Sequence, residues 1–147
     1  MLVSGWAMLH EIKHCICQQD GDSSTDGDME AKHAEELRCD AYATSFVMNG
    51  VTDYANRSGE DRSLVKRKRA TGIYFAAFAL ALLSHGAWTE SESHPSIESR
   101  IEAIRQQVSG DVLDEPLLIA ALAFVSLGDV LEGASALLFG STVPFTV

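Results

Sequence analysis

Residues 10–14 read His-Glu-Ile-Lys-His, an H-E-x-x-H pattern in which two imidazoles bracket a carboxylate. On an α-helix, side chains four residues apart lie one above the other, so His10 and His14 can direct ring nitrogens at one metal ion. Glu11 would then project beside the metal, where a carboxylate can take a proton from water whose pKa the metal has lowered. The pattern therefore predicts a helix that carries a catalytic zinc (Zn2+) site, with Glu11 as the general base.

The residues around this pattern also favour a helix. The stretch from Val3 to Cys17 contains no Gly or Pro after Gly5, and its apolar side chains follow a helical spacing. The apolar stripe consists of Trp6, Leu9, Ile12 and Ile16. A catalytic zinc site keeps one position open for water and needs a third protein ligand, which has to come from another part of the chain.

The stretch from residue 29 to residue 48 is the second one with strong helical character, and it presents two acids on one face. Glu36 and Asp40 lie four residues apart, so both point into the same partly buried seam. Burying an unpaired carboxylate is costly, and a metal ion or a metal-bound imidazole would be a suitable partner. His33 lies three residues before Glu36 and is a rival third ligand that the spacing leaves open.

Three sequence elements together resemble those of the gluzincin metallopeptidases. Glu36-Leu-Arg-Cys-Asp40 resembles the E-x-x-[AC]-D element of that group, and His94-Pro-Ser-Ile-Glu-Ser-Arg-Ile101 resembles the H-P-x-x-x-x-R-I motif of the HtpX-like and CAAX-protease enzymes. The lead-in from Gly5 to His10 and the Glu35-Glu36 pair are most similar to the phage-exclusion peptidases of the Lit type. The three elements occur in the same order and span roughly residues 3–105.

The resemblance implies a role for each matching residue of the first two elements. His10, His14 and Glu36 would bind zinc, and Glu11 would be the general base. Asp40 would orient a ligand imidazole by accepting a hydrogen bond from its other ring nitrogen. The implied activity is hydrolysis of a protein or peptide substrate by a zincin-like domain.

The third element carries two further implied roles. His94 would face the negative charge that develops on the substrate oxygen, and Arg100 would hold the motif in place by pairing with an acid. From the residues alone, His94 merely precedes a helix, because Pro95 suits the first turn and Glu98 favours the positive end of the helix dipole.

Composition predicts a single domain over residues 1–147, because a chain of this length that is 46% hydrophobic can bury one good core. Alternating patterns typical of β-strands are scarce, so we expect a mainly α fold with little or no β-sheet. The motifs occupy residues 3–105, and residues 111–147 form an apolar tail with a helical pattern and no motif. A net charge of −10 argues against nucleic acid as a partner.

A basic cluster at residues 62–69 precedes an apolar run at residues 72–83, an order that can mark a membrane span. As a helix, however, this run would be about 18 Å long, and a hydrocarbon core is about 30 Å thick. We therefore expect a buried core helix. The alternative is an inner-membrane associated protein that is anchored by residues 72–88 and 117–139.

Cysteine usage and the insert between the two helices complete the prediction. Cys15, Cys17 and Cys39 are an odd set without a secretory signal, which favours reduced thiols in a cytoplasmic protein. The insert at residues 18–28 is rich in Asp and Ser, and Thr25 stands where a calcium loop needs Gly. We expect a solvated loop there.

One alternative from another functional class stays open. Lit-type and related enzymes have a longer segment before the zinc helix, commonly with a strand edge on which the substrate lies, whereas nine residues precede His10 here. A truncated front would remove substrate docking. We expect a zinc metalloendopeptidase, and the alternative is a catalytically silent helical zinc-binding or interaction protein.

Overall fold

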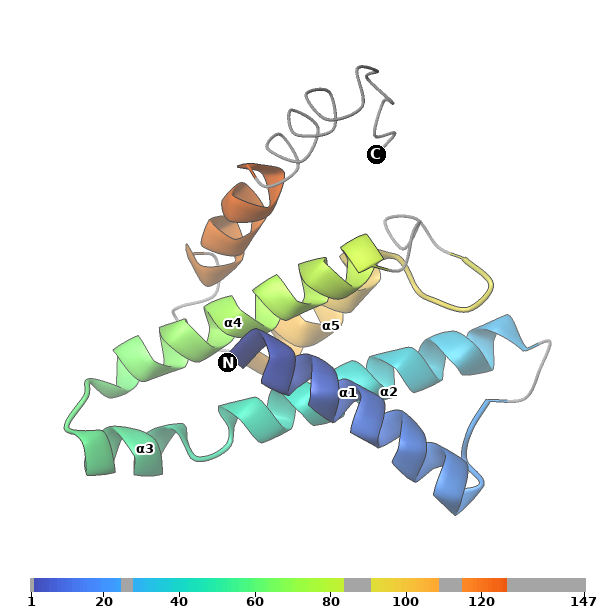
Figure 1. Cartoon of the computed structure of the whole chain (residues 1–147), viewed down its shortest axis with the longest axis horizontal. Helices are drawn as coiled ribbons and strands as arrows, with labels where there is room; N and C mark the ends of the chain where they lie inside the picture. The colour runs from blue at the N-terminus through green and yellow to red at the C-terminus, as the bar shows by residue number, and fades with distance from the viewer. Residues whose placement is uncertain (1, 25–27, 84–90, 109–114, 127–147) are drawn as a thin grey trace, which may run out of the picture.

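The computed structural model describes residues 2–24, 28–83, 91–108 and 115–126 (Figure 1). Those residues form helices and contain no β-strand, which confirms the prediction of a mainly α fold. The elements are α1 (Leu2–Asp20), α2 (Met29–Met48), α3 (Val51–Ser58), α4 (Arg62–Leu83) and α5 (Ile97–Val108). Residues 115–126 of the predicted apolar tail are also helical, and the rest of the tail from residue 127 lies outside the described residues.

The end of α1 and the start of α2 follow from local sequence signals. Gly21 has a φ of 76°, and this left-handed position lets the N–H of Asp22 donate to the carbonyl of Cys17 at 2.9 Å. Asp28 then caps α2, because its side chain accepts a hydrogen bond from the N–H of Ala31 at 2.9 Å. The chain thus reverses after α1, and α2 crosses α1 in Figure 1.

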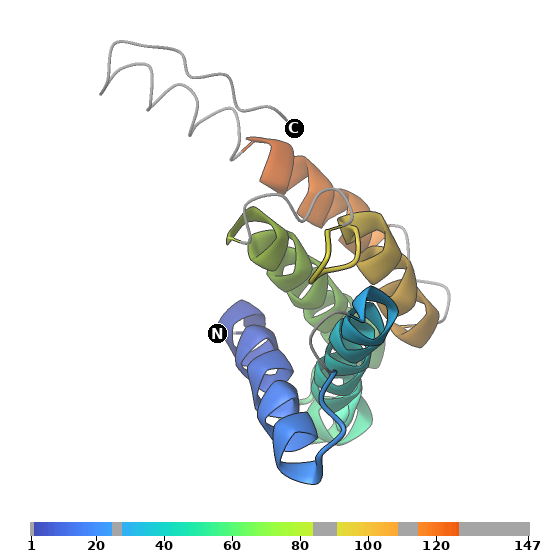
Figure 2. The same cartoon turned by 90° about the vertical axis from the view of Figure 1, so that its right-hand side faces the viewer.

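Helix α4 lies at the centre of the bundle and contacts each of the other four labelled helices, α1, α2, α3 and α5 (Figures 1 and 2). Its apolar run supplies several core residues, including Ile73, Tyr74 and Ala77, which are fully buried. At the crossing with α1, Gly72 lies so close to Leu2 that a Cβ atom added to the glycine would be 2.9 Å from the Leu2 Cβ. Within the described residues, no helix is long and apolar enough to cross a membrane.

The inward side of α1 differs from the predicted apolar stripe. Trp6, His10 and Cys17 are buried, and these three positions fall on one narrow arc of the helix. Ile12, a member of the predicted apolar stripe, projects from the other side of α1 and is 42% exposed. The indole N–H of Trp6 donates to the Thr44 hydroxyl at 3.1 Å, which joins α1 to α2 beside His10.

Candidate metal centre

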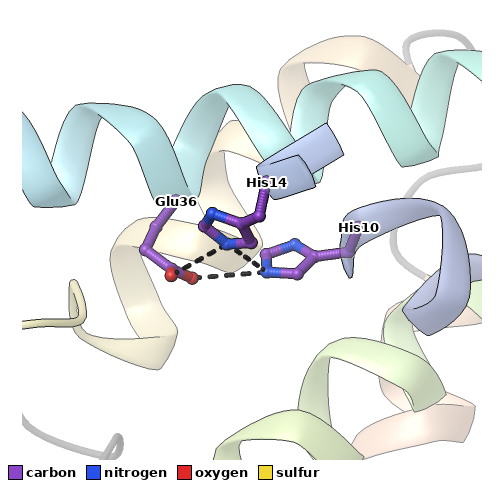
Figure 3. Close-up of side chains that lie close together, drawn as sticks. All are labelled: His10, His14 and Glu36. Atoms are coloured by element: carbon purple, nitrogen blue, oxygen red, sulfur yellow. Dashed lines mark hydrogen bonds and ion pairs between the residues drawn. The ribbon is translucent and has the colours of Figure 1, made fainter. Parts of the chain in front are cut away.

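Three side chains with possible metal-ligand atoms lie close together: His10 and His14, on successive turns of α1, and Glu36 on α2 (Figure 3). The Nε2 atoms of His10 and His14 are 3.2 Å apart. The Oε2 of Glu36 lies 3.4 Å from the Nε2 of His10, and the Oε1 of Glu36 lies 3.2 Å from the Nε2 of His14. Among the described residues, these three form the group of His, Cys, Asp and Glu side chains that could hold a metal ion.

The spacing of these atoms fits a small tetrahedral ion. Zinc bonds of about 2.0–2.1 Å in a tetrahedron place neighbouring ligand atoms about 3.3–3.4 Å apart. The two Nε2 atoms are 3.2 Å apart, and each lies 3.2–3.4 Å from a different oxygen of the Glu36 carboxylate, which can ligate through either oxygen. Two imidazoles and one carboxylate are also a donor set that zinc accepts, with a fourth position left for water or substrate. The residues present therefore fit zinc in both geometry and chemistry.

Each imidazole is held by an acid at its other nitrogen. The Nδ1 of His10 donates to Asp40 at 3.0 Å, and the Nδ1 of His14 donates to Glu35 at 2.9 Å. An ionised carboxylate can only accept, so both Nδ1 atoms carry hydrogen and both Nε2 lone pairs are available to a cation. Acid partners of this kind fix the tautomer and orientation of metal-ligating histidines.

Asp40 and Arg100 form a buried pair that joins α2 to α5. The guanidinium of Arg100 donates to both oxygens of Asp40, at 2.8 Å from Nε and 2.6 Å from Nη2. Asp40 is 0% exposed and Arg100 is 1% exposed. The Nη1 of Arg100 also lies 3.7 Å from Glu36. Asp40 thus contacts the His10 imidazole, and Arg100 joins α5 to α2, while the roles predicted for the two residues stay predictions.

The electrostatics of the centre favour positive charge. Burial alone would lower the pKa of His10, but hydrogen bonds to Asp40 and Glu36 outweigh it and raise the pKa. The pKa of His14 is raised to about 11, first by a hydrogen bond with Cys39 and then by one with Glu36. Burial opposes ionisation of Glu36, yet hydrogen bonds from His10 and His14 lower its pKa. A divalent cation would supply the charge that these imidazoles otherwise take up as protons.

Glu11 and His94 lie on the wall of the same cleft. This cleft has a volume of about 280 Å³ and is also lined by the three ligand residues, Leu80 and Arg100. Glu11 is exposed on the side of α1 next to the ligands. The Nε2 of His94 lies 3.8 Å from Glu36, and its Nδ1 is 2.7 Å from the Ser93 hydroxyl. The cleft therefore brings together the predicted ligands, base and oxyanion residue.

His33, the rival third ligand, lies outside the three-residue group. Its Nε2 is 2.7 Å from the carbonyl oxygen of Ser91, in the segment that leads to His94. The structure thus favours Glu36 over His33 as the third ligand.

Glu35 contacts a candidate ligand, and the sequence did not predict this contact. It was noted only as part of a Glu35-Glu36 pair, and its contact with His14 was not predicted. Adjacent acids on a helix point in directions about 100° apart. The pair could therefore have been interpreted as one ligand and one residue that orients a different histidine.

Comparison with known proteins gives one match. The sequence profile of the family Peptidase U49 matches residues 1–122, a range that contains every residue of the centre and its cleft. Searches of curated proteins and of solved structures found no match. Because the matched range covers well over half of the chain, the chain belongs to the Peptidase U49 family, a family of peptidases.

Proposed function

We propose that this protein is a zinc-dependent endopeptidase of the gluzincin type that hydrolyses a peptide bond in a protein substrate. The observation that carries the proposal is the convergence of the His10 and His14 Nε2 atoms and the Glu36 carboxylate, with both imidazoles held by acids. The lead-in from Gly5 to His10 and the Glu35-Glu36 pair support a place near the Lit-type peptidases. A role in phage exclusion and a cytoplasmic location stay predictions.

The ligand residues and the base would divide the chemistry between them. Zinc held by His10, His14 and Glu36 would act as a Lewis acid, which lowers the pKa of a water molecule and polarises the scissile carbonyl. Glu11 borders the ligands in the cleft, where its carboxylate can accept a proton from the attacking water. The same carboxyl group can then deliver that proton to the leaving amine nitrogen.

His94 would stabilise negative charge on the substrate oxygen. The Ser93 hydroxyl can donate to Nδ1 of His94, which leaves a hydrogen on Nε2, the nitrogen that faces Glu36 across the cleft. A donor aimed at the developing oxyanion contributes mainly in the transition state. Arg100 is buried and occupied by Asp40, so its role is to position α5 and the segment before it.

The experiment that tests the proposal measures metal and activity on the same preparations. We expect about one zinc per chain in the purified protein, loss of zinc in His14→Ala, and cleavage of an unfolded protein such as casein. Glu11→Gln should retain zinc while turnover falls by roughly 10²–10⁴. Glu98→Gln, a change of the same type at an exposed position on α5, is the matched control.

The outcomes separate the functional classes. A folded protein without zinc would reject the metal site. Zinc with no turnover in parent or variant would favour the silent zinc-binding alternative. Equal turnover in parent and Glu11→Gln would exclude Glu11 as the base, and a fall of less than about tenfold in His94→Ala would exclude an oxyanion role for His94.

A further inference from the structure

We propose that Glu35 is a positioning residue of the metal centre and that it couples the loop after α1 to the ligand His14. The inference deepens the proposed function and rests on the metal site described there. Glu35 is buried, lies on α2 next to the ligand Glu36, and does not line the cleft, so it acts through other residues.

The carboxylate of Glu35 receives hydrogen bonds from two segments of the chain. Its Oε1 accepts from the Nδ1 of His14 at 2.9 Å. Its Oε2 accepts from the backbone N–H of Ser24 at 2.6 Å, and the Ser23 hydroxyl lies 3.3–3.4 Å from both oxygens. Oε1 therefore contacts both the ligand and the loop, and Oε2 contacts the loop, so that movement of the loop would alter the support of His14.

The loop itself is attached to α2 at two points. Besides the contact of Ser24 with Glu35, the carbonyl of Asp22 accepts a hydrogen bond from Arg38 at 3.2 Å. The described part of the predicted solvated loop thus lies against the helix that supplies the third ligand. Residues 25–27 lie outside the described residues.

Replacing Glu35 by Gln separates a positioning role from simple space filling. Gln has the same shape but one acceptor oxygen, so its NH2 group would face an N–H donor on either His14 or Ser24. Loss of such an outer partner typically weakens metal binding by about 10–100-fold. Glu35→Asp keeps both acceptor oxygens and should recover part of that loss.

The experiment titrates Co2+ and Zn2+ into the metal-free full chain. We expect Glu35→Gln to bind both metals about 10–100-fold more weakly than the parent and to change the visible absorption of bound Co2+. Glu30→Gln, which removes an exposed acid from the first turn of the same helix, is the matched control and should bind like the parent. Circular dichroism of each variant checks that the helices are retained.

Hydrogen exchange tests the coupling in the unaltered protein. Binding of Zn2+ should slow exchange in residues 21–24 of the parent, while a segment across α3 should not respond. If Glu35→Gln and Glu35→Asp bind metal like the parent, the positioning role is wrong and the metal site stands. If hydrogen exchange at residues 21–24 is the same with and without zinc, the proposed coupling between the loop and His14 is wrong. A parent chain that binds neither metal would overturn both the site and this inference.

Discussion

Asp40 contacts both a metal ligand and the buried arginine of α5, so its replacement should affect two properties at once. Asp40→Asn keeps the shape but removes the charge that faces Arg100, which leaves a guanidinium that is 1% exposed without its carboxylate. Breaking a buried ion pair in this way costs about 3–5 kcal/mol. We expect that loss in the free energy of unfolding in urea, together with weaker zinc binding through His10.

The control for this prediction is Asp53→Asn, the same change at an exposed position on α3. It should alter the free energy of unfolding by less than about 0.5 kcal/mol. A similar small effect at Asp40 would mean that the pair contributes little to stability.

The stability of the metal-free protein should depend on pH through His14 and Glu35. The pKa of His14 is raised from 6.5 to about 11, so its contribution is complete below pH 6.5 and is lost as the pH rises toward 11. The pKa of Glu35 is lowered from 4.5 to about 2, despite burial, by hydrogen bonds from Ser24 and His14. Its contribution is complete above pH 4.5 and is lost as the pH falls toward 2.

We therefore expect the metal-free protein to be most stable between about pH 4.5 and 6.5 and to weaken on both sides. Urea unfolding in the presence of a chelator, repeated across this range, provides the measurement. In His14→Gln, the free energy of unfolding should fall less steeply as the pH rises above 6.5. An unchanged fall in that variant would contradict the assignment to His14.

Residue-level prediction succeeded where a motif fixes the spacing along one helix. The H-E-x-x-H pattern placed His10, His14 and Glu11 side by side, because four residues make about one helical turn. It could not reveal the contact between Glu35 and His14. That contact depends on how α2 is rotated against α1, which is set by packing around Trp6 and Thr44 and not by a local pattern.

At the scale of elements, the crossing of α1 and α4 depends on the missing side chain at Gly72. Alanine would favour the helix by about 1 kcal/mol. The added Cβ would, however, lie 2.9 Å from the Cβ of Leu2, too close for two carbon atoms. We expect Gly72→Ala to destabilise the parent by about 1–3 kcal/mol, the usual cost of overpacking.

A double-mutant cycle isolates this contact. In a Leu2→Gly background the clashing atom is gone, so Gly72→Ala should become neutral or stabilising. Thermal unfolding of the four proteins gives the coupling energy. A coupling below about 0.5 kcal/mol would show that α1 shifts freely at this crossing.

The helices themselves were predictable from apolar spacing, but the side that each turns inward was less so. In α1, the stripe that includes Ile12 suggested one face, and the buried residues Trp6, His10 and Cys17 define another. A histidine counts as polar in a pattern, yet His10 is buried because Asp40 and Glu36 satisfy its ring nitrogens. Patterns based on hydrophobicity therefore misplace a face that contains a polar site.

At the scale of the whole molecule, the proposed metal would join α1 to α2, and Asp40 with Arg100 would extend this connection to α5. A ligand that binds only the folded state adds about 4 kcal/mol when its free concentration is about 1,000 times its Kd. We expect a chelator to lower the melting temperature and zinc to restore it. The melting temperature of His14→Ala should change with neither chelator nor zinc. If the melting temperature of the parent is the same with chelator as with zinc, the prediction is contradicted.

The mainly helical character of the chain could be anticipated from its patterns, but the arrangement of the helices could not. The apolar run of α4 was expected to be a core helix, and its contacts with α1, α2, α3 and α5 depend on long-range packing. Small residues such as Gly72 and Ala77 permit these crossings, and a pattern of single residues does not say which helix they meet.

The acids and the arginine around the centre also define a charge balance. Among the buried residues that the structure describes at the site, three carboxylates, Glu35, Glu36 and Asp40, accompany one guanidinium, Arg100, which leaves two negative charges when both imidazoles are neutral. A divalent ion would cancel that charge completely. A monovalent ion would leave half of it in a largely buried place, where an uncompensated charge is costly. The net charge of the site therefore favours a divalent ion over a monovalent one, whereas the ligand geometry discriminates among the divalent metals.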